Sequence, residues 1–162
     1  KWFNHEWIKK MSISELQPYI EDLFLERDFD ISDKEKVTKI ITLLKDRCTL
    51  LTDFVEQSAF VFKTPESIDT AAIQPKWSDQ KVQFYTELMP AYESVSLWQH
   101  DNLEAIFKER AGSAGIKPGE LMFALRIMLI GEKHGPGVFD IASIIGKEET
   151  IRRIKHGLEL MK

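Results

Sequence analysis

The chain has 162 residues, of which 43% are apolar and 30% are charged, with 8 Gly, 6 Pro and a net charge of −4. This composition is typical of a globular protein with one domain or two small ones, and it excludes disordered and low-complexity chains. No apolar run approaches the roughly 20 residues needed to cross a bilayer, and the N-terminus lacks the apolar stretch of a signal peptide, so we expect a cytoplasmic protein with no membrane partner.

The charge is divided unevenly along the chain. Residues 1–102 carry 12 Lys and Arg against 18 Asp and Glu, whereas residues 103–162 carry 10 against 8. The net negative charge argues against nucleic-acid binding through bulk charge alone, although a local basic surface can still contact phosphates. If RNA is a partner, the distal part is the better candidate by charge.

Apolar residues recur at helical spacing almost throughout the chain. Ser14-Glu15-Leu16-Gln17 and Ser32-Asp33-Lys34-Glu35 have the form of capping boxes, in which side chains satisfy the N–H groups at a helix start. The first predicts a helix to about Glu26, and the second predicts a helix along the stripe Val37, Ile40, Ile41 and Leu44. Thr49–Phe62 is too apolar for an open surface and predicts a buried helix.

A proline and polar residues over Lys63–Ser67 break the helical pattern. We place a subdomain boundary there, between residues 1–64 and residues 65–162. Beyond the boundary, a helix is expected from Gln80 to about Trp98 with an interruption at Pro90. The next helix is expected to begin at an N-cap residue, Asp101, and to run to Arg110.

Glycine and proline delimit the last helices. Leu121–Ile130 is expected to end at Gly131, while Pro136 suits the first turn of a helix that ends at Gly146. The final helix places Ile151, Ile154, Leu158 and Met161 on one stripe, and mostly outside it lie Arg152, Arg153, Lys155 and Lys162. Strand-like alternation is short everywhere, so the predicted fold class is all-α, with two packed helical subdomains.

The sequence offers no self-sufficient catalytic or metal site. One segment is similar to a KMSKS signature, Lys10-Met11-Ser12-Ile13-Ser14, but the apolar Ile13 stands where a lysine would stabilise ATP phosphates. A HIGH-like segment, His134–Gly137, follows this segment in the chain, whereas in class I aminoacyl-tRNA synthetases it precedes KMSKS. The four histidines are far apart, and no P-loop, GxGxxG, HExxH, CxxC or GxSxG pattern is present. We interpret the single Cys48 as a core residue, with a catalytic thiol as the alternative.

Three segments, in order, resemble the C-terminal anticodon-binding region of bacterial glutamyl-tRNA synthetases, which are class I aminoacyl-tRNA synthetases. Trp2–Ile8 resembles W-L-N-x-x-Y-I, and Leu43–Leu50 resembles L-x-x-E-R-x-x-T-L with Asp46 for the usual Glu and Thr49 one place early. Residues 125–148 resemble P-L-R-x-A-x-T-G, then P-G-L-F-E, then L-G-K-E. The departures from these patterns are Ala124, Ile130 and Gly135.

The resemblance implies an anticodon-binding α-helix cage that receives the anticodon loop of tRNA-Glu. It also implies that the parent enzyme is a glutamate–tRNA ligase, which attaches glutamate to tRNA-Glu using ATP, with Mg, in an absent N-terminal catalytic domain. The fragment itself is then expected to be non-catalytic, to hold no cofactor and to be a monomer.

Three features of the sequence are candidates for contact with RNA, and the resemblance identifies the first of them. Arg47 matches the arginine that contacts the third anticodon base, a cytosine, and its planar guanidinium offers donors to the acceptor edge of that base. Arg126 is the second candidate, because a buried or half-buried arginine among apolar neighbours needs a partner, which could be RNA. The turn with Gly135, Pro136 and Val138 is the third, because a helix start presents N–H groups and glycine lets a base approach the backbone.

Each candidate also has a purely structural interpretation. Arg47 could cover a helix end or pair with Asp46 or Asp53, Arg126 could bind a carboxylate or backbone carbonyls, and the turn could be only a connector. Two other functions stay open: the similar domain of a class I lysyl-tRNA synthetase, and a helical protein-interaction domain with an acidic interface.

Overall fold

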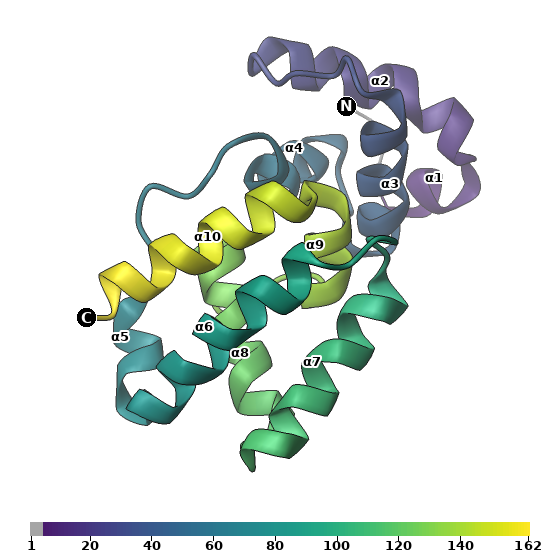
Figure 1. Ribbon diagram of the computed structural model, residues 1–162. Coiled ribbons are helices and arrows are strands. Elements are labelled where there is room, and N and C mark those ends of the chain that lie inside the picture. The colour runs from purple at the N-terminus through teal and green to yellow at the C-terminus, as the bar shows by residue number, and fades with distance from the viewer. Residues whose placement is uncertain (1–4) are drawn as a thin grey trace. The chain divides into compact units, whose positions relative to one another are not determined.

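The computed structural model describes residues 5–162, and these fall into two compact units, the first ending at residue 63 and the second covering residues 64–162. Every regular element in residues 5–162 is a helix (Figure 1), which confirms the predicted all-α class. Among these residues, no helix is long and apolar enough to cross a membrane. Trp2, Phe3 and Asn4, which open the first resembling segment, lie outside the described residues.

The first unit contains α1 (His5–Lys10), α2 (Ile13–Glu26), α3 (Lys34–Leu44), the 3₁₀ turn η1 (Lys45–Arg47) and α4 (Leu51–Phe62). Helices α2, α3 and α4 pack against one another, and α1 packs against η1. The apolar stripe predicted on α3 is buried, because Val37, Ile40, Ile41 and Leu44 are all at most 1% exposed. The residues that the sequence marked as apolar therefore form the core of this unit.

Helix α2 begins at a different cap from the expected one, although it ends at Glu26 as expected. Its N-cap is Ser12, not Ser14: the Ser12 hydroxyl accepts from the Glu15 N–H at 3.1 Å, and the Glu15 carboxylate accepts from the Ser12 N–H at 2.8 Å. At the other end Asp28 adopts φ 59°, and the Phe29 N–H donates to the Phe24 carbonyl at 2.9 Å. This is a helix-closing motif in which glycine usually takes the left-handed position.

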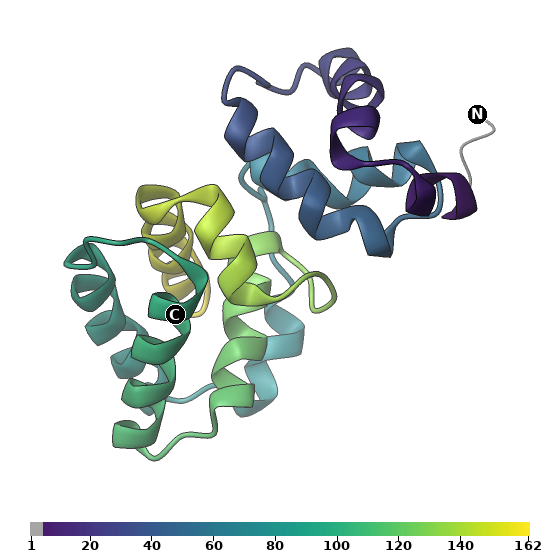
Figure 2. The same cartoon turned by 90° about the vertical axis from the view of Figure 1, so that its right-hand side faces the viewer.

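The second unit contains α5 (Thr70–Ile73), the 3₁₀ turn η2 (Gln74–Lys76), α6 (Asp79–Glu93), α7 (His100–Ala114), α8 (Pro118–Ile130), α9 (Val138–Ile145) and α10 (Lys147–Leu160). Helix α8 contacts α5, α7, α9 and α10, and α10 also packs along α6 (Figure 2). Six residues of α8 are buried: Leu121, Ala124, Leu125, Ile127, Met128 and Leu129. Helix α8 therefore forms the centre of this unit.

Several predicted boundaries in this unit were wrong. Pro90 lies within an unbroken α6, and α7 has Gln99 as its N-cap, with Asp101 already in the first turn. Pro136 precedes the N-cap of α9, which is Gly137, so it does not lie in the first turn of that helix. Gly131 and Gly146 do end their helices, as expected.

A close approach joins α8 and α10. A Cβ atom added at Gly157 would lie 2.6 Å from Met128 Cγ and 3.2 Å from Met128 Cβ. Any side chain at this position would force these two helices apart or displace Met128. Glycine is therefore required here by packing, not by its backbone conformation.

Candidate nucleic-acid interface

Arg47 ends η1 and its side chain is exposed. The residues on either side of η1, Leu44 and Cys48, are fully buried, and the Gln57 side chain donates to the Arg47 carbonyl at 3.4 Å. Within residues 5–162, the Arg47 guanidinium makes no hydrogen bond or ion pair with the protein. The core thus fixes the backbone at Arg47 and leaves its five N–H donors in solvent.

Asp53, which the sequence offered as an ion-pair partner for Arg47, serves another purpose. Its carboxylate accepts from the Leu50 N–H at 2.9 Å, and from the Thr49 N–H and hydroxyl, both at 3.0 Å. The hydrogen bond from Leu50 is the main cause that lowers the pKa of Asp53, those from Thr49 add to it, and partial burial opposes them. Asp53 therefore stabilises the start of α4 and leaves Arg47 unpaired with it.

Cys48 lies beside these residues and is fully buried. Burial raises the pKa of its thiol to about 12, and the charge of Asp53 adds to the increase while that of Arg47 opposes it. A thiol that stays protonated and inaccessible is a poor nucleophile. The geometry thus fits the interpretation of Cys48 as a packing residue.

Arg126 is half-buried on α8 and contacts the loop that follows this helix. Its Nε and Nη2 atoms both donate to the Pro136 carbonyl, each at 3.2 Å. The fork of the guanidinium therefore holds the end of the loop near the start of α9. This is the backbone-carbonyl contact that the sequence left open as the structural interpretation of Arg126.

The turn from Gly131 to Val138 brings the remaining candidates together in the second unit. Pro136 is buried and Val138 is 1% exposed, so their side chains pack inside the unit. A Cβ atom at Gly135 would lie 2.5 Å from Ile130 Cδ1, so the loop passes close to the end of α8. The buried side chains of Pro136 and Val138 are therefore not available to RNA, and at these candidate positions a contact would use the backbone at Gly135, Gly137 and the first turn of α9.

Gly131, the first residue of this loop, occupies a position that favours glycine. It adopts φ 90° as the C-cap of α8, and its carbonyl accepts from the Asp69 N–H at 3.0 Å. A Cβ atom here would lie 3.1 Å from the Ser67 carbonyl oxygen. The left-handed backbone conformation and the close contact with Ser67 both favour glycine at this position. The start of the loop is therefore fixed by the packing of Gly131 against residues 67–69.

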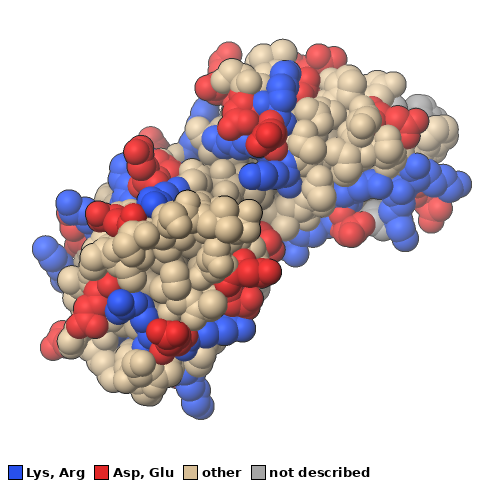
Figure 3. Space-filling view, turned by 45° about the vertical axis from the view of Figure 1, so that its right-hand side comes forward, with Lys and Arg blue, Asp and Glu red and all other residues tan. Residues whose placement is uncertain are grey.

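Figure 3 shows how charge is distributed over the surface. On the face in view, Lys and Arg side chains are interspersed with Asp and Glu side chains over both units. This pattern agrees with the net charge of −4 and with the absence of a bulk basic surface on that face. On this face, recognition of a polyanion would therefore depend on small local clusters of Lys and Arg.

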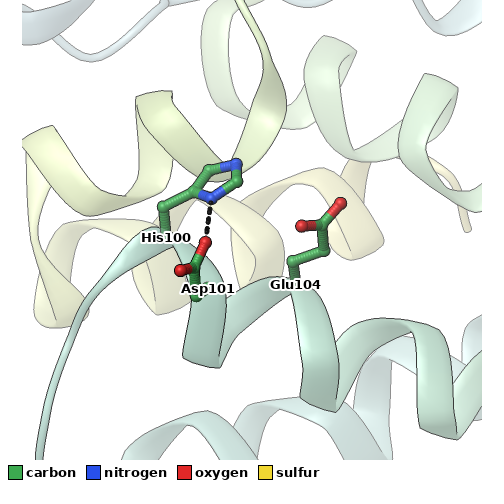
Figure 4. Close-up of side chains that lie close together, drawn as sticks. All are labelled: His100, Asp101 and Glu104. Carbon is green, nitrogen blue, oxygen red and sulfur yellow. Dashed lines mark hydrogen bonds and ion pairs between the residues drawn. The ribbon is translucent and has the colours of Figure 1, made fainter.

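Within the described residues, one group of side chains has the spacing of a metal site: His100, Asp101 and Glu104, in the first turns of α7 (Figure 4). His100 Nδ1 lies 3.0 Å from an Asp101 oxygen, and this hydrogen bond is the main cause that raises the pKa of His100. Glu104 is paired with Lys108 at 2.8 Å. The three groups are thus engaged in local ion pairs, and we assign them no metal.

A buried network on α10 was not indicated by the sequence. Arg153 was expected outside the apolar stripe, but it is 2% exposed and donates to the Leu129 carbonyl on α8 at 2.6 Å. Its Nε atom also donates to Glu149 at 2.7 Å, and Glu149 in turn accepts from Thr64 and Arg152. This network fixes the end of α8, one turn beyond Arg126.

Comparison with known proteins identifies the class of this domain. Residues 11–158 match the anticodon binding domain family, and the chain belongs to that family. The chain is 33% identical to the glutamate–tRNA ligase of Phocaeicola vulgatus, and the match covers all of this chain and 32% of that protein. It is 32% identical to the glutamate–tRNA ligase of Flavobacterium johnsoniae, and this match covers 99% of this chain and 32% of that protein.

A solved structure gives the same result. It is the crystal structure of a glutamate tRNA ligase from Elizabethkingia meningosepticum in complex with its amino acid. The match has a TM-score of 0.91 and 35% sequence identity, and it covers 99% of this chain and 32% of the other. The predicted resemblance to the glutamyl-tRNA synthetase region is confirmed, and the comparisons do not favour the alternative functions. The chain spans about a third of the length of these relatives.

Proposed function

We propose that the chain is the anticodon-binding part of a glutamate–tRNA ligase and that it binds the anticodon loop of tRNA-Glu. The observation that carries the proposal is a match over essentially the whole chain to proteins of that name, in sequence and in fold. The parent enzyme attaches glutamate to tRNA-Glu using ATP and Mg in a catalytic domain outside this chain. It acts in the cytoplasm, and this part is a monomer that takes no cofactor.

Arg47 is the proposed reader of the third anticodon base. Proteins read single-stranded RNA loops by splaying bases out and bonding their exposed edges. The Arg47 guanidinium is exposed and unpaired within the described residues, so its donors can reach the acceptor edge of a cytosine without breaking an internal contact. Because its backbone is held between buried Leu44 and Cys48, binding restricts chiefly the side chain.

Arg126 and the turn that contains Gly135, Pro136 and Val138 have a different role in this proposal. Arg126 positions the Pro136 carbonyl, and the exposed backbone at Gly137 and the N–H groups of the first turn of α9 face the RNA. The buried side chains of Pro136 and Val138 pack inside the unit and hold this backbone in place. In this arrangement Arg126 positions the loop, and Arg47 discriminates between bases.

The test is binding of the 162-residue chain to tRNA-Glu and to its anticodon variants at one fixed salt concentration. We expect weak binding that falls when the third anticodon base is changed, and we expect Arg47→Gln to reduce that difference. A good base contact contributes about 1–3 kcal/mol by analogy with base readout in DNA. Equal binding of all variants by the unmodified chain would overturn the anticodon assignment.

The activity of the chain supplies an independent check. We expect no glutamate-dependent ATP–pyrophosphate exchange from the isolated chain, because Ile13 occupies a position where the KMSKS signature has lysine. Robust exchange would show that the Lys10–Ser14 segment had been misinterpreted.

A further inference from the structure

A second basic group lies beside Arg47, on a segment that is distant in the sequence. Helix α1 ends in Lys9 and Lys10, and Lys45 opens η1, the turn that ends in Arg47. The Lys45 ammonium donates to the Lys9 carbonyl at 3.3 Å, across 36 residues of chain. The end of α1 is thereby joined to η1, and four cations gather there: Lys9, Lys10, Lys45 and Arg47.

Burial determines which way these segments face. On α1 the buried residue is Ile8, which is fully inaccessible, whereas Lys9 and Lys10 are exposed. On η1, Lys45 is half-buried and Arg47 is exposed. Each segment is thus anchored in the core through its apolar neighbours, and both present their cations to solvent.

The carboxylates near this group are already occupied. Glu15 caps α2, and its pKa is lowered chiefly by its hydrogen bonds with Ser12 and in smaller part by the charge of Lys45. Asp53 accepts three hydrogen bonds at the start of α4. Glu6 on α1 and Asp46 in η1 are exposed, and neither forms an ion pair with these cations among residues 5–162. Lys9, Lys10 and Arg47 therefore have no carboxylate partner within the described chain.

An ordinary explanation accounts for part of the group. Lysines in the last turn of a helix are favoured by the helix dipole, but α1 has only 6 residues, so this effect is small. It does not explain why Lys9, Lys10 and Arg47 are exposed on adjoining segments without a carboxylate partner among residues 5–162. Lys45 is held by the Lys9 carbonyl and by the charge of Glu15, whereas an external anion explains the exposure of Lys9, Lys10 and Arg47 together.

We propose that Lys9, Lys10 and Lys45, here called the α1–η1 lysine cluster, bind the phosphodiester backbone of the RNA whose base Arg47 contacts. The proposal rests on the proposed function, because it takes Arg47 as the base reader. Lysine is a compact point charge on a flexible stem, which suits a phosphate but carries no base specificity. The cluster therefore sets the register of the strand, and Arg47 distinguishes the base.

The experiment compares the double variant Lys9→Gln/Lys10→Gln with the unmodified 162-residue chain. Binding of tRNA-Glu is measured across a range of salt concentrations, and far-UV circular dichroism checks the fold. Removing one lysine–phosphate interaction should reduce the slope of log K against log salt by about 0.7 to 0.9. We expect a slope shallower by up to about 1.8 in the double variant, with the ratio of affinities between anticodon variants unchanged.

Two control variants make the result specific. Lys9→Arg/Lys10→Arg keeps both charges and should retain the slope of the unmodified chain. Lys108→Gln removes an exposed cation from α7 in the other unit and should leave the slope unchanged. An equal reduction of the slope with Lys108→Gln, or an unchanged slope in the double Gln variant, would overturn the proposal.

The two proposals fail in different ways. If the unmodified chain binds all anticodon variants equally while the double Gln variant has a shallower slope, the anticodon assignment is wrong and the phosphate cluster stands. If the anticodon preference is present while the slope of the double Gln variant is unchanged, only the phosphate cluster is wrong.

Discussion

Arg153 and Glu149 form an ion pair one turn apart on α10, with 2.7 Å between Arg153 Nε and Glu149 Oε2 and only 2% of the Arg153 side chain exposed. The same guanidinium donates to the Leu129 carbonyl at 2.6 Å, and so it joins the centre of α10 to the end of α8. Burying a guanidinium is tolerated only when its charge and its donors are matched. This pair supports the helix on which Arg126 lies.

Replacing Arg153 should therefore be costly. Arg153→Ala leaves Glu149 without its buried partner and the Leu129 carbonyl without its donor, and we expect a loss of about 3–5 kcal/mol in the free energy of unfolding. Chemical denaturation of both proteins measures the loss. The matched control is Arg152→Ala, whose side chain is 59% exposed and which should cost less than about 1 kcal/mol. Similar losses in the two variants would contradict a stabilising role for the buried Arg153.

Stability should depend on acid pH through Glu149. Partial burial opposes ionisation of its carboxyl, but hydrogen bonds from Thr64, Arg152 and Arg153, together with the charge of Arg153, lower its pKa from 4.5 to about 2. The resulting stabilisation is present above pH 4.5 and is lost as the pH falls towards 2, because the unfolded carboxyl takes up its proton first. The contribution is at most about 3 kcal/mol.

The measurement is denaturation of Glu149→Gln and of the unmodified chain at several pH values. The variant should be the less stable of the two near neutral pH, and the difference should shrink as the pH falls below 4.5. A difference that stays constant down to a pH of about 2 would mean that the Glu149 charge does not contribute.

Two glycines in helices should respond to alanine in opposite directions. Gly157→Ala places a methyl group 2.6 Å from Met128 Cγ, and we expect a net loss of about 1–2 kcal/mol because overpacking outweighs the gain in helix propensity. Gly112, on α7, has no neighbouring atom within 4 Å of an added Cβ, so Gly112→Ala should stabilise by about 0.5–1 kcal/mol. Melting temperatures of the two variants decide the question, and a stabilised Gly157→Ala would contradict the close packing of α8 and α10.

The end of α2 offers a stabilising substitution. Asp28 has φ 59°, a conformation that glycine adopts without steric cost, and its negative charge lies at the unfavourable end of the helix dipole. Asp28→Gly should therefore raise the free energy of unfolding by about 0.5 kcal/mol, while Asp28→Val should lower it by about 1–2 kcal/mol. Urea denaturation of both variants tests this ordering. The reverse order would mean that residue 28 does not hold this conformation in solution.

The role of Arg126 can be tested with a charge-conserving change. Arg126→Lys keeps the cation but loses the two donors that converge on the Pro136 carbonyl. We expect faster amide hydrogen exchange over residues 131–138 and weaker binding of tRNA-Glu, by a similar factor for every anticodon variant. Unchanged exchange with a changed preference among anticodon variants would instead make Arg126 a direct reader of a base.

The helical class and much of the core could be predicted because they depend on local signals. The stripe Val37, Ile40, Ile41 and Leu44 is buried as its spacing indicated, and Gly131 ends α8 as a residue with positive φ should. Such features depend on periodicity and on backbone stereochemistry, which a single sequence contains. Helix starts were less certain, because Ser12 and Ser14 offer competing caps and only the packed structure selects Ser12.

The parts that could not be predicted depend on contacts between distant residues. Arg153 lies outside the apolar stripe of α10, and it is buried because its guanidinium binds the Leu129 carbonyl on α8 and the Glu149 carboxylate one turn away. The spacing of apolar residues indicates neither contact. The joining of Lys45 to the end of α1 is of the same kind. For the proposed site, the sequence indicated Arg47 by resemblance, whereas only the structure shows that Asp53 caps α4 and so does not pair with it.

The buried Cys48 has a practical consequence for studying this domain. Its inaccessible, protonated thiol should not react with maleimide dyes while the protein is folded. A single cysteine introduced on the surface can therefore be labelled selectively without removing the natural one. Fluorescence from such a label would follow RNA association in real time, and the appearance of a second labelled site would report unfolding of the first unit.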